Sequence, residues 1–354
     1  MDSCPGEEGQ SQRGSALIDP EKVAVVGGGS WGTAFANTLA LKGLKVILWC
    51  RRQDLADSIS NDHLNSDYLP GTFLSPRLRA TSDLQEALEE ASVAVMAVPS
   101  QGFREVVRDV GSLISEAVPI VSLAKGLEQE TLFRMSEVAV QEVPSAEGRV
   151  ASLSGPNLAK EIAEGYPAAA VIASSQSSVS DHLQELFMSP TFRTYANDDI
   201  IGVEFAGVVK NVIAIATGIG EGLGFGDNTR AMVITRGLSE MTRLGVSLGA
   251  DPLTFSGLAG VGDLICTCMS TLSRNHHVGL ELGKGRPIDE ILDGMSQVAE
   301  GVRSSKAVKM LADRQGVEMP IANGVYQVIH EAQPVSEMVS ELLRTIRPRE
   351  RDDF

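Results

Sequence analysis

The chain has 354 residues and a formal net charge of −16 at pH 7. This length allows two domains of ordinary size, and an apolar content of 43% is enough to build a sizeable core. The negative charge argues against nucleic acid as the main partner, and we expect no membrane span because no apolar run approaches the length of one.

The first part of the chain predicts a leader followed by an α/β domain. Residues 1–20 are polar and rich in Gly and Ser, without the apolar centre of a secretion signal, which predicts a disordered leader. From residue 21 to 200, short apolar runs alternate with helical patterns, which predicts a Rossmann-type, doubly wound, mostly parallel sheet. We expect its strands at residues 22–26, 46–49, 93–98, 120–123, 150–153 and 168–173.

Beyond residue 200 the pattern changes to one helix after another. This change predicts an all-α domain over residues 201–335, followed by a C-terminal tail over 336–354. The pattern of residues 204–221 is apolar on nearly every side, which is typical of a helix buried within a domain or at a subunit contact. A homodimer is therefore compatible with the sequence, but burial inside one chain explains the pattern equally well. Further helices are expected over residues 229–248 and 252–268.

A glycine-rich turn follows the first expected strand. Gly27, Gly29 and Gly32 have the spacing Gly-x-Gly-x-x-Gly and precede a helical pattern, an arrangement that binds the pyrophosphate of a dinucleotide. The second glycine lets the backbone approach the phosphates, and the helix N-terminus supplies N–H donors. A plain glycine-rich turn is the alternative, but the position between a strand and a helix favours the dinucleotide site.

Two arginines at the end of the second expected strand bear on the choice of cofactor. An acidic residue there would bind the ribose 2′-hydroxyl of NAD, whereas a basic residue would bind the 2′-phosphate of NADP. Arg51 and Arg52 precede the first acidic residue, Asp54, and guanidinium groups suit a phosphate. We therefore expect NADP(H), with NAD(H) tolerated; two solvated surface arginines are the alternative.

Lys210 is a single cation within the apolar pattern of residues 204–218. An ammonium group there must be paired, reach solvent or face a cavity. A lysine in a partly dry site can supply the proton that a ketone oxygen takes up on reduction, which makes Lys210 the candidate catalytic residue. A structural salt bridge explains the same position equally well.

Other polar residues follow expected strands or lie in glycine-rich turns. Ligands of open α/β sheets bind beyond the carboxyl ends of the strands, where the sequence places polar groups after the fourth and fifth strands. Farther along, one carboxylate follows a glycine-rich approach, and a hydroxyl, a guanidinium and an amide in succession suit a phosphate or a polyol. Each of these could be a satisfied loop residue alone. The candidates are Lys125, Gly155, Asn157, Asp263, Ser273, Arg274 and Asn275.

In their joint order and spacing, these motifs resemble those of the bacterial-type, soluble NAD(P)-dependent glycerol-3-phosphate dehydrogenases. The resemblance covers roughly residues 22–331 and includes the segment 202–215. The other matching stretches are GGGSWGTA from residue 27, NSDYLPG from 65, AVPS from 97, SLAKG from 122, LSGPN from 153, GLAGVGDL from 257, SRN from 273 and VAEG from 298.

The resemblance implies reduction of dihydroxyacetone phosphate to sn-glycerol 3-phosphate with NAD(P)H, feeding phospholipid synthesis. It implies that Lys210 accepts the proton in the oxidative direction. It also implies that the substrate is contacted by Lys125, Gly155, Asn157, Lys210, Asp263, Ser273, Arg274 and Asn275. The family commonly has Ser or Thr where this chain has Asn157, and a polar residue where it has Leu158. The residues implied to contact the cofactor, besides the glycines, are Ser30, Trp31, Arg51, Arg52, Tyr68, Lys125, Ala159, Arg274, Val298 and Glu300.

Two other functions fit parts of the pattern. A dehydrogenase of the β-hydroxyacid or 6-phosphogluconate type would combine a similar sheet with helices, and a non-catalytic NADP(H)-sensing module would need only the glycine turn and the arginines.

The four cysteines, Cys4, Cys50, Cys266 and Cys268, show neither a disulfide framework nor the spacing of a zinc site. They fit a reducing compartment, so we expect a cytoplasmic protein without a metal.

Overall fold

The computed structural model describes residues 21–295 and 299–344. Within these residues, eight strands form one sheet in the order β3-β2-β1-β4-β5-β6-β7-β8. Every neighbouring pair is parallel except β6 and β7, which confirms the predicted mostly parallel, doubly wound sheet. The strands are β1 (Lys22–Val26), β2 (Lys45–Trp49), β3 (Arg79–Thr81), β4 (Val93–Met96), β5 (Ile120–Ser122), β6 (Val150–Ser154), β7 (Ala168–Ser174) and β8 (Phe192–Asn197).

Helices cover both faces of the sheet, and each face has its own core. One core contains Phe35 of α1 and Leu183 of α7, and the other contains Phe103 of α4 and Val138 of α5. All five side chains of β1 are buried, as expected for a strand covered on both faces. The helices of this half are α1 (Ser30–Lys42), α2 (Gln53–Asp57), η1 (Ser58–Asp62), α3 (Leu84–Leu88), α4 (Phe103–Leu113), α5 (Met135–Glu142), η2 (Pro144–Ala146), α6 (Ala159–Ala163) and α7 (Ser177–Phe187).

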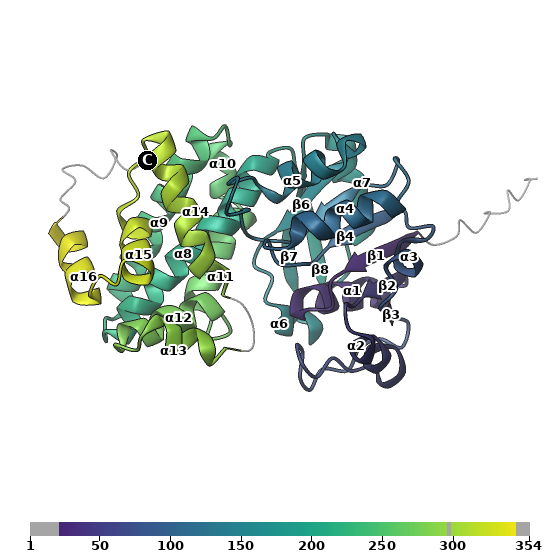
Figure 1. Ribbon diagram of the computed structural model, residues 1–354, viewed down its shortest axis with the longest axis horizontal. Coiled ribbons are helices and arrows are strands. Elements are labelled where there is room, and N and C mark those ends of the chain that lie inside the picture. Colours follow the sequence, from purple (N-terminus) through teal and green to yellow (C-terminus); the bar gives the residue numbers. More distant parts are fainter. Residues whose placement is uncertain (1–20, 296–298, 345–354) are drawn as a thin grey trace, which may run out of the picture.

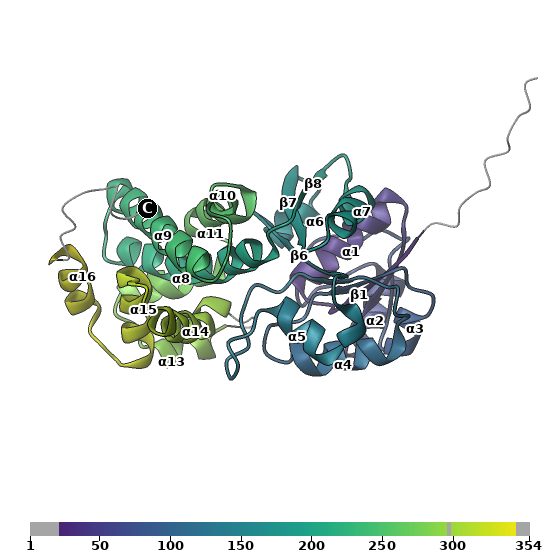
Figure 2. The same cartoon turned by 90° about the horizontal axis from the view of Figure 1, so that it is seen from above.

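The second half is helical and lies beside the sheet half (Figures 1 and 2). The change from strands to helices occurs between the end of β8 and the start of α8, and the predicted domain limits stay predictions. The helices are α8 (Ile200–Gly222), α9 (Asp227–Ser247), α10 (Pro252–Phe255), η3 (Leu258–Gly262), α11 (Asp263–Met269), α12 (Arg274–Gly283), α13 (Ile288–Asp293), α14 (Glu300–Gln315), α15 (Pro320–His330) and α16 (Val335–Arg344).

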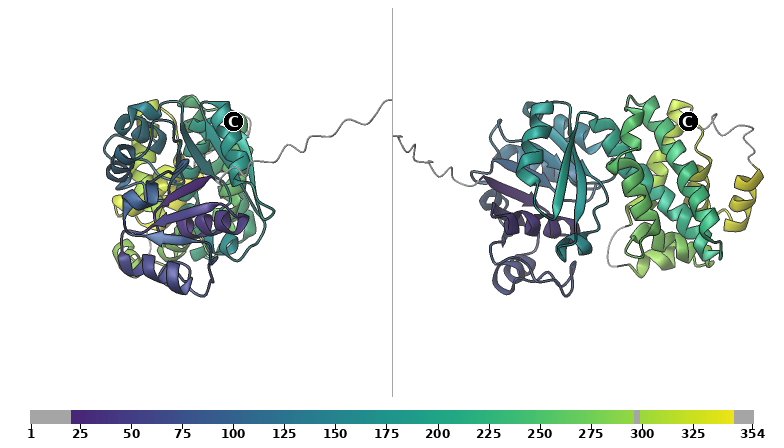
Figure 3. Two further views of the ribbon diagram at one scale, coloured as in Figure 1. Left: turned by 90° about the vertical axis from the view of Figure 1, so that its right-hand side faces the viewer. Right: turned by 180° about the vertical axis from the view of Figure 1, so that it is seen from behind.

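Helix α8 is the centre of the helical half, because α9, α11, α12, α14 and α15 all contact it. Figure 3 shows the helical half and the sheet half from two further sides. Two segments of the described residues are long and apolar enough to cross a membrane by length and composition, Ile200–Gly222 and Pro252–Met269. In the first, which is α8, 89% of the apolar window is buried inside the protein. Its apolar surface is therefore covered by the neighbouring helices, as in the core helix of a globular domain.

Helices α8 and α12 approach each other closely because glycines face each other along their contact. A Cβ atom at Gly218 or Gly222 of α8 would collide with the backbone of α12, and one at Gly279 or Gly283 of α12 would collide with the backbone of α8. These glycines are four residues apart on each helix, so they lie on one face of it. The backbones of the two helices are therefore in direct contact.

Several details differ from the sequence-based expectation. The strands β3 and β8 were not predicted; β3 has only three residues, and β8 alternates buried and exposed side chains instead of forming an apolar run. The single helix expected over 252–268 is three elements, because the π-helical turn η3, which begins just after Gly257, separates α10 from α11. Helix α16 lies in the segment predicted as a tail. The predicted leader 1–20 and residues 345–354 lie outside the described residues.

Candidate active site

The glycine turn lies where the strand order of the sheet reverses. β1 pairs with β2 on one side and with β4 on the other, and ligands of open α/β sheets bind at such a point. Gly27 has a φ of 127°, which favours glycine, and a Cβ atom on Gly32 would collide with the carbonyl of Gly27. A Cβ atom on Gly29 would meet nothing within 4 Å. The backbone at Gly29 is thus open to a ligand, while the other two glycines are required by packing.

Hydrogen bonds from residues 65–68 hold the glycine turn in place. Buried Asn65 donates from Nδ2 to the carbonyl of Gly28 at 3.0 Å and to Oγ1 of Thr33 at 2.8 Å. Ser30 donates from Oγ to the carbonyl of Tyr68 at 2.9 Å. Helix α1 has no side-chain cap at Gly29, so its first turn presents backbone N–H groups toward the open side of the turn.

The two arginines beyond β2 differ in their surroundings. Arg52 forms ion pairs with Asp67 and, at 3.5 Å, with Asp54. Exposed Arg51 forms no ion pair or side-chain hydrogen bond with the residues that the structure describes. Both guanidinium groups were expected to suit a phosphate, but only that of Arg51 is without an ion pair to the described residues.

Trp31 is half-buried on the first turn of α1. Its ring lies 5.6 Å from that of Phe35 and 6.2 Å from that of Phe192, both at tilted angles. The indole N–H is buried and has no partner among the described residues. Trp31 is thus anchored in the core on one side.

Two lysines from distant parts of the chain meet at one carboxylate. Lys210 on α8 donates from Nζ to Oδ1 of Asp263 at 2.7 Å, and Lys125, just after β5, donates to Oδ2 at 2.6 Å. Lys210 also donates to Oγ1 of Thr267 at 2.6 Å, and Lys125 to the carbonyl of Gly155 at 2.8 Å. An ammonium group has three donors, so each lysine keeps one for a ligand.

Burial and charge shift the pKa values at this cluster. Burial lowers the pKa of Lys125 to about 8, and the charge of Lys210 adds to this effect although Asp263 opposes it. Burial also disfavours the ionised form of Asp263, but the two ammonium groups outweigh that effect and lower its pKa. The cluster therefore holds an ionised carboxylate between two cations in a water-poor site.

The loop after β6 contributes backbone and amide groups beside Lys125. Gly155 has a φ of 148°, and a Cβ atom there would lie 3.0 Å from the backbone of Ala170. The Oδ1 and Nδ2 atoms of Asn157 are buried without a hydrogen-bond partner. Ala159 begins α6, two residues farther on. The loop thus presents an unpaired amide close to the lysine cluster.

The residues at the start of α12 are connected to the lysine cluster through Asn211, which donates from Nδ2 to the carbonyl of Lys125 at 3.4 Å. Asn275 donates from Nδ2 to Oδ1 of Asn211 at 2.8 Å and accepts from the backbone N–H of Gly301 at 2.8 Å. Both ends of the Asn275 amide are therefore engaged within the protein. Ser273 caps α12, and Arg274 is exposed with no ion pair or side-chain hydrogen bond to the described residues.

Glu300 lies at the first turn of α14 and connects back to the sheet half. Its Oε2 accepts from Oγ of Ser100 at 3.0 Å, and burial raises its pKa. Ser100 follows β4 near the glycine turn. The predicted residue Val298 lies outside the described residues. Of the predicted residues, Lys125 and Lys210 contact Asp263 directly, and the carbonyl of Tyr68 contacts Ser30 beside the glycine turn.

Comparisons with known proteins identify the family of the chain. The family model of the NAD-dependent glycerol-3-phosphate dehydrogenase N-terminus matches residues 22–180, and that of the C-terminus matches residues 199–340. The chain belongs to the NAD-dependent glycerol-3-phosphate dehydrogenase family. This membership favours the main interpretation of the sequence over both alternatives, the β-hydroxyacid or 6-phosphogluconate type of enzyme and the sensing module.

Relatives in this family match nearly the whole chain. The chain is 49% identical over 336 residues to the glycerol-3-phosphate dehydrogenase [NAD(P)+] of Streptomyces coelicolor, covering 95% of this chain and all of the relative. It is 50% identical to glycerol-3-phosphate dehydrogenase [NAD(P)+] 2 of Sphingopyxis alaskensis, covering 92% and 96%. The crystal structure of the Coxiella burnetii enzyme superposes with a TM-score of 0.86 at 41% identity, covering 92% and 99%. Family members are NAD(P)-dependent oxidoreductases that act on a CH–OH group.

Sequence reasoning did not single out two residues of the site, Thr267 and Asn65. Thr267 contacts both Lys210 and Asp263, and it follows Asp263 by four residues on α11. That helical spacing could have identified it, since side chains four residues apart share a helix face. Asn65 was quoted only as part of a motif, and its contact with the glycine turn bridges residues far apart in sequence.

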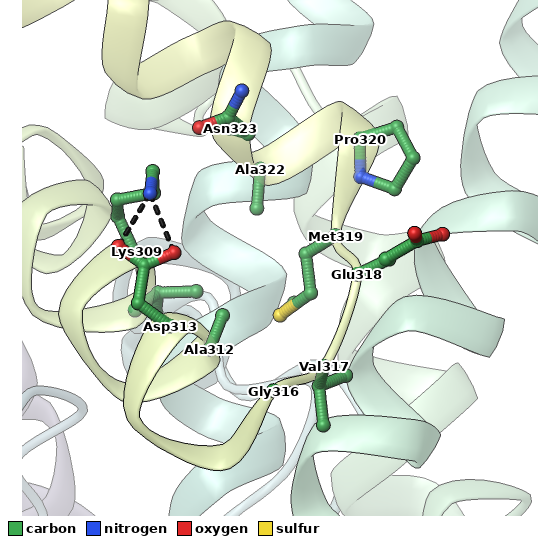
Figure 4. Close-up of a pocket in the computed structure, with 11 residues that line it drawn as sticks. Lys309, Ala312, Asp313, Gly316, Val317, Glu318, Met319, Pro320, Ala322 and Asn323 are labelled. Atoms are coloured by element: carbon green, nitrogen blue, oxygen red, sulfur yellow. Dashed lines mark hydrogen bonds and ion pairs between the residues drawn. The ribbon is translucent and has the colours of Figure 1, made fainter. Parts of the chain in front are cut away.

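A separate cavity of about 570 Å³ lies between the end of α14 and the start of α15. Figure 4 shows its lining residues, including Lys309 and Asp313, which form an ion pair, and Met319. None of the predicted site residues lines it. The cavity therefore does not coincide with the chemistry at Asp263, which is where we place the active site.

Among the described residues, no group of three His, Cys, Asp or Glu side chains could hold a metal ion.

Proposed function

We propose that the chain catalyses the reversible reduction of dihydroxyacetone phosphate to sn-glycerol 3-phosphate, a precursor of phospholipids. The observation that carries this proposal is the pair of lysines on Asp263, each with one N–H left for a ligand. A carbonyl oxygen that becomes an alkoxide needs a nearby cation and a proton donor, and this cluster can supply both.

The glycine turn supports a nicotinamide dinucleotide as the cofactor. The space beside Gly29 and the uncapped first turn of α1 suit a pyrophosphate. Arg51 would bind a 2′-phosphate, and Trp31, Tyr68, Ala159 and Glu300 would line the remainder of the site. A bound NAD(P)H supplies the hydride that reduces the central carbon.

Lys210 is the proton donor in the direction of reduction. Its Nζ is held by Asp263 and Thr267, so its third N–H can be directed at the substrate oxygen. When the carbon gains the hydride, Lys210 gives its proton to the oxygen, and in oxidation the neutral amine takes the proton back. Lys125 stabilises the developing negative charge from the other side of Asp263.

The start of α12 supports binding of the substrate phosphate. The guanidinium group of Arg274 forms no ion pair or hydrogen bond with the described residues, although the charge of Glu300 acts on it. Ser273 and the first N–H groups of the helix adjoin Arg274 in sequence. Asn275 contributes through Asn211, because its own amide is engaged. The phosphate would therefore bind at the start of α12, whereas the carbonyl would bind at Lys210 on the neighbouring helix α8.

An assay that monitors NADPH oxidation by its absorbance, with and without dihydroxyacetone phosphate, tests the proposal. We expect turnover only with the substrate, and Lys210→Ala should remove most of kcat while NADPH binding is retained. Lys309→Ala is the matched control, because Lys309 pairs with Asp313 away from the site. Retained turnover in Lys210→Ala would contradict the assignment. The homodimer and the cytoplasmic location stay predictions.

A further inference from the structure

Ser154, the last residue of β6, has a buried hydroxyl without a partner. The residue is 2% exposed, and its Oγ makes no hydrogen bond to the described residues. By contrast Ser174, equally buried on the neighbouring strand β7, donates from Oγ to the carbonyl of Val150 at 2.9 Å. A buried hydroxyl without a partner is costly, so its presence calls for a group that the protein itself does not supply.

The hydroxyl of Ser154 packs on α8 beside the aliphatic stem of Lys125. A Cβ atom built on Gly207 of α8 would lie 3.1 Å from Oγ of Ser154 and 3.3 Å from Cγ of Lys125. Both side chains therefore pack on one spot of α8, the spot that Gly207 leaves open. Lys210 follows Gly207 by three residues, so it lies about one helical turn away on the same face.

A second unpaired group lies three residues farther along the same loop. Both polar atoms of the Asn157 amide are buried without a partner, and the carbonyl of Gly155 between the two residues accepts from Lys125. A hydroxyl and an amide can each donate and accept hydrogen bonds. The loop therefore presents two neutral groups suited to a ligand hydroxyl, which also donates and accepts.

We propose that Ser154, assisted by Asn157, binds the free hydroxyl of the three-carbon substrate. The inference rests on the proposed function. In dihydroxyacetone phosphate, the phosphate is assigned to Arg274 and the carbonyl to the lysines, which leaves the hydroxyl on the opposite terminal carbon. Ser154 packs beside the stem of Lys125, and its hydroxyl is neutral, so it can exchange hydrogen bonds with a neutral ligand hydroxyl. Ser154 is thus a specificity-determining residue for substrates with a hydroxyl next to the carbonyl.

The test compares two substrates, dihydroxyacetone phosphate and hydroxyacetone phosphate, in which a hydrogen replaces the free hydroxyl. The kcat/KM for dihydroxyacetone phosphate divided by that for hydroxyacetone phosphate measures recognition of that hydroxyl. In Ser154→Ala we expect the ratio to fall about tenfold, the effect of one hydrogen bond, because kcat/KM falls only for dihydroxyacetone phosphate. Asn157→Ala should lower the ratio in the same direction.

Thermal unfolding separates this role from a structural one. Ser154→Ala removes a hydroxyl that has no partner, so its Tm should be unchanged or raised. The control Ser174→Ala loses a hydrogen bond, so its Tm should fall while its substrate ratio stays at the wild-type value.

An unchanged ratio in Ser154→Ala, or an equal loss for both substrates, would overturn the inference. If Ser154→Ala could not be purified folded, an unchanged ratio in Asn157→Ala would overturn it instead. Absence of wild-type turnover with dihydroxyacetone phosphate would be a different result, because it would overturn the proposed function itself.

Discussion

Lys125 and Lys210 share one counter-ion, the carboxylate of Asp263, and each contacts a different oxygen of it. One lysine follows a strand of the sheet and the other lies on the central helix of the helical half. Asp263 is thus a point at which the two halves of the protein meet in a charged cluster, and its removal would leave two cations without their partner.

Asp263→Asn should impair both catalysis and stability. The change leaves two lysines without a counter-charge, and breaking buried ion pairs typically costs about 3 to 5 kcal/mol. We expect kcat to fall by about 100-fold or more, because Lys210 loses its orientation. Steady-state kinetics and urea unfolding measure the two effects. Asp313→Asn, which breaks an exposed pair, should change stability by less than about 1 kcal/mol, and equal losses in both variants would contradict the prediction.

The buried position of Lys125 predicts a pH dependence of stability. Its pKa falls from 10.5 to about 8 on folding, so between these values the unfolded chain binds more protons than the folded one. The free energy of unfolding therefore gains a term that rises with pH in this window. Comparison of wild type with Lys125→Met by urea unfolding isolates the term, and the difference should grow in favour of wild type from about pH 8 upward. A difference that shrinks with pH would contradict the assignment.

Arg51 should determine the preference for NADPH. Because it carries no ion pair to described residues, Arg51→Ala should raise KM for NADPH by about tenfold or more, the effect of a charge-assisted hydrogen bond, with little change for NADH. Arg52→Ala should have a smaller effect, since Asp54 and Asp67 already engage its guanidinium group. Equal changes for both cofactors in Arg51→Ala would show that this residue does not bind a 2′-phosphate.

Arg274 should act through the phosphate of the substrate. Arg274→Ala should lower kcat/KM for dihydroxyacetone phosphate by about 100-fold, while the low activity with dihydroxyacetone stays the same. Discrimination between these two substrates would then be lost. The control Arg286→Ala removes an exposed arginine that pairs with Glu281. A variant of Arg274 that still discriminates would place the phosphate elsewhere.

The glycine turn offers a matched pair of variants. A methyl group on Gly29 meets nothing within 4 Å, so Gly29→Ala should fold with an unchanged Tm yet bind NADPH more weakly, by about tenfold or more. In Gly32→Ala the methyl group collides with the carbonyl of Gly27, so the Tm should fall even without cofactor. Calorimetry with and without NADPH distinguishes the two. Unimpaired NADPH binding by Gly29→Ala would contradict a pyrophosphate at this position.

Much of the fold could be predicted from the sequence because buried strands and apolar helices carry clear patterns. The run at β1 and the apolar helix α8 are examples, and both are buried as predicted. Strand β8 escaped prediction because it lies at the edge of the sheet, where exposed residues such as Tyr195 interrupt the apolar pattern. The break at Gly257 escaped because glycine is compatible with both a continuous and an interrupted helix.

For the candidate site, the sequence gives residue types but not their pairings. Position after a strand was enough to propose Lys125, and isolation in an apolar helix was enough to propose Lys210. That both contact Asp263 depends on the packing of α8 and α11 against the sheet, which local patterns do not contain. The engaged amide of Asn275 and the unpaired hydroxyl of Ser154 are likewise visible only in three dimensions.

The glycine contact between α8 and α12 has a consequence for substrate length. Lys210 lies on one helix and Arg274 begins the other, so the span from proton donor to phosphate depends on how far apart the two helices lie. With Gly218 and Gly279 in the contact, no side chain at these positions holds the two helices apart, and a Cβ atom on either would collide with the backbone of the other helix. A larger side chain at either position would lengthen the site. In the proposed function, these glycines would therefore limit the number of carbons between carbonyl and phosphate without touching the substrate.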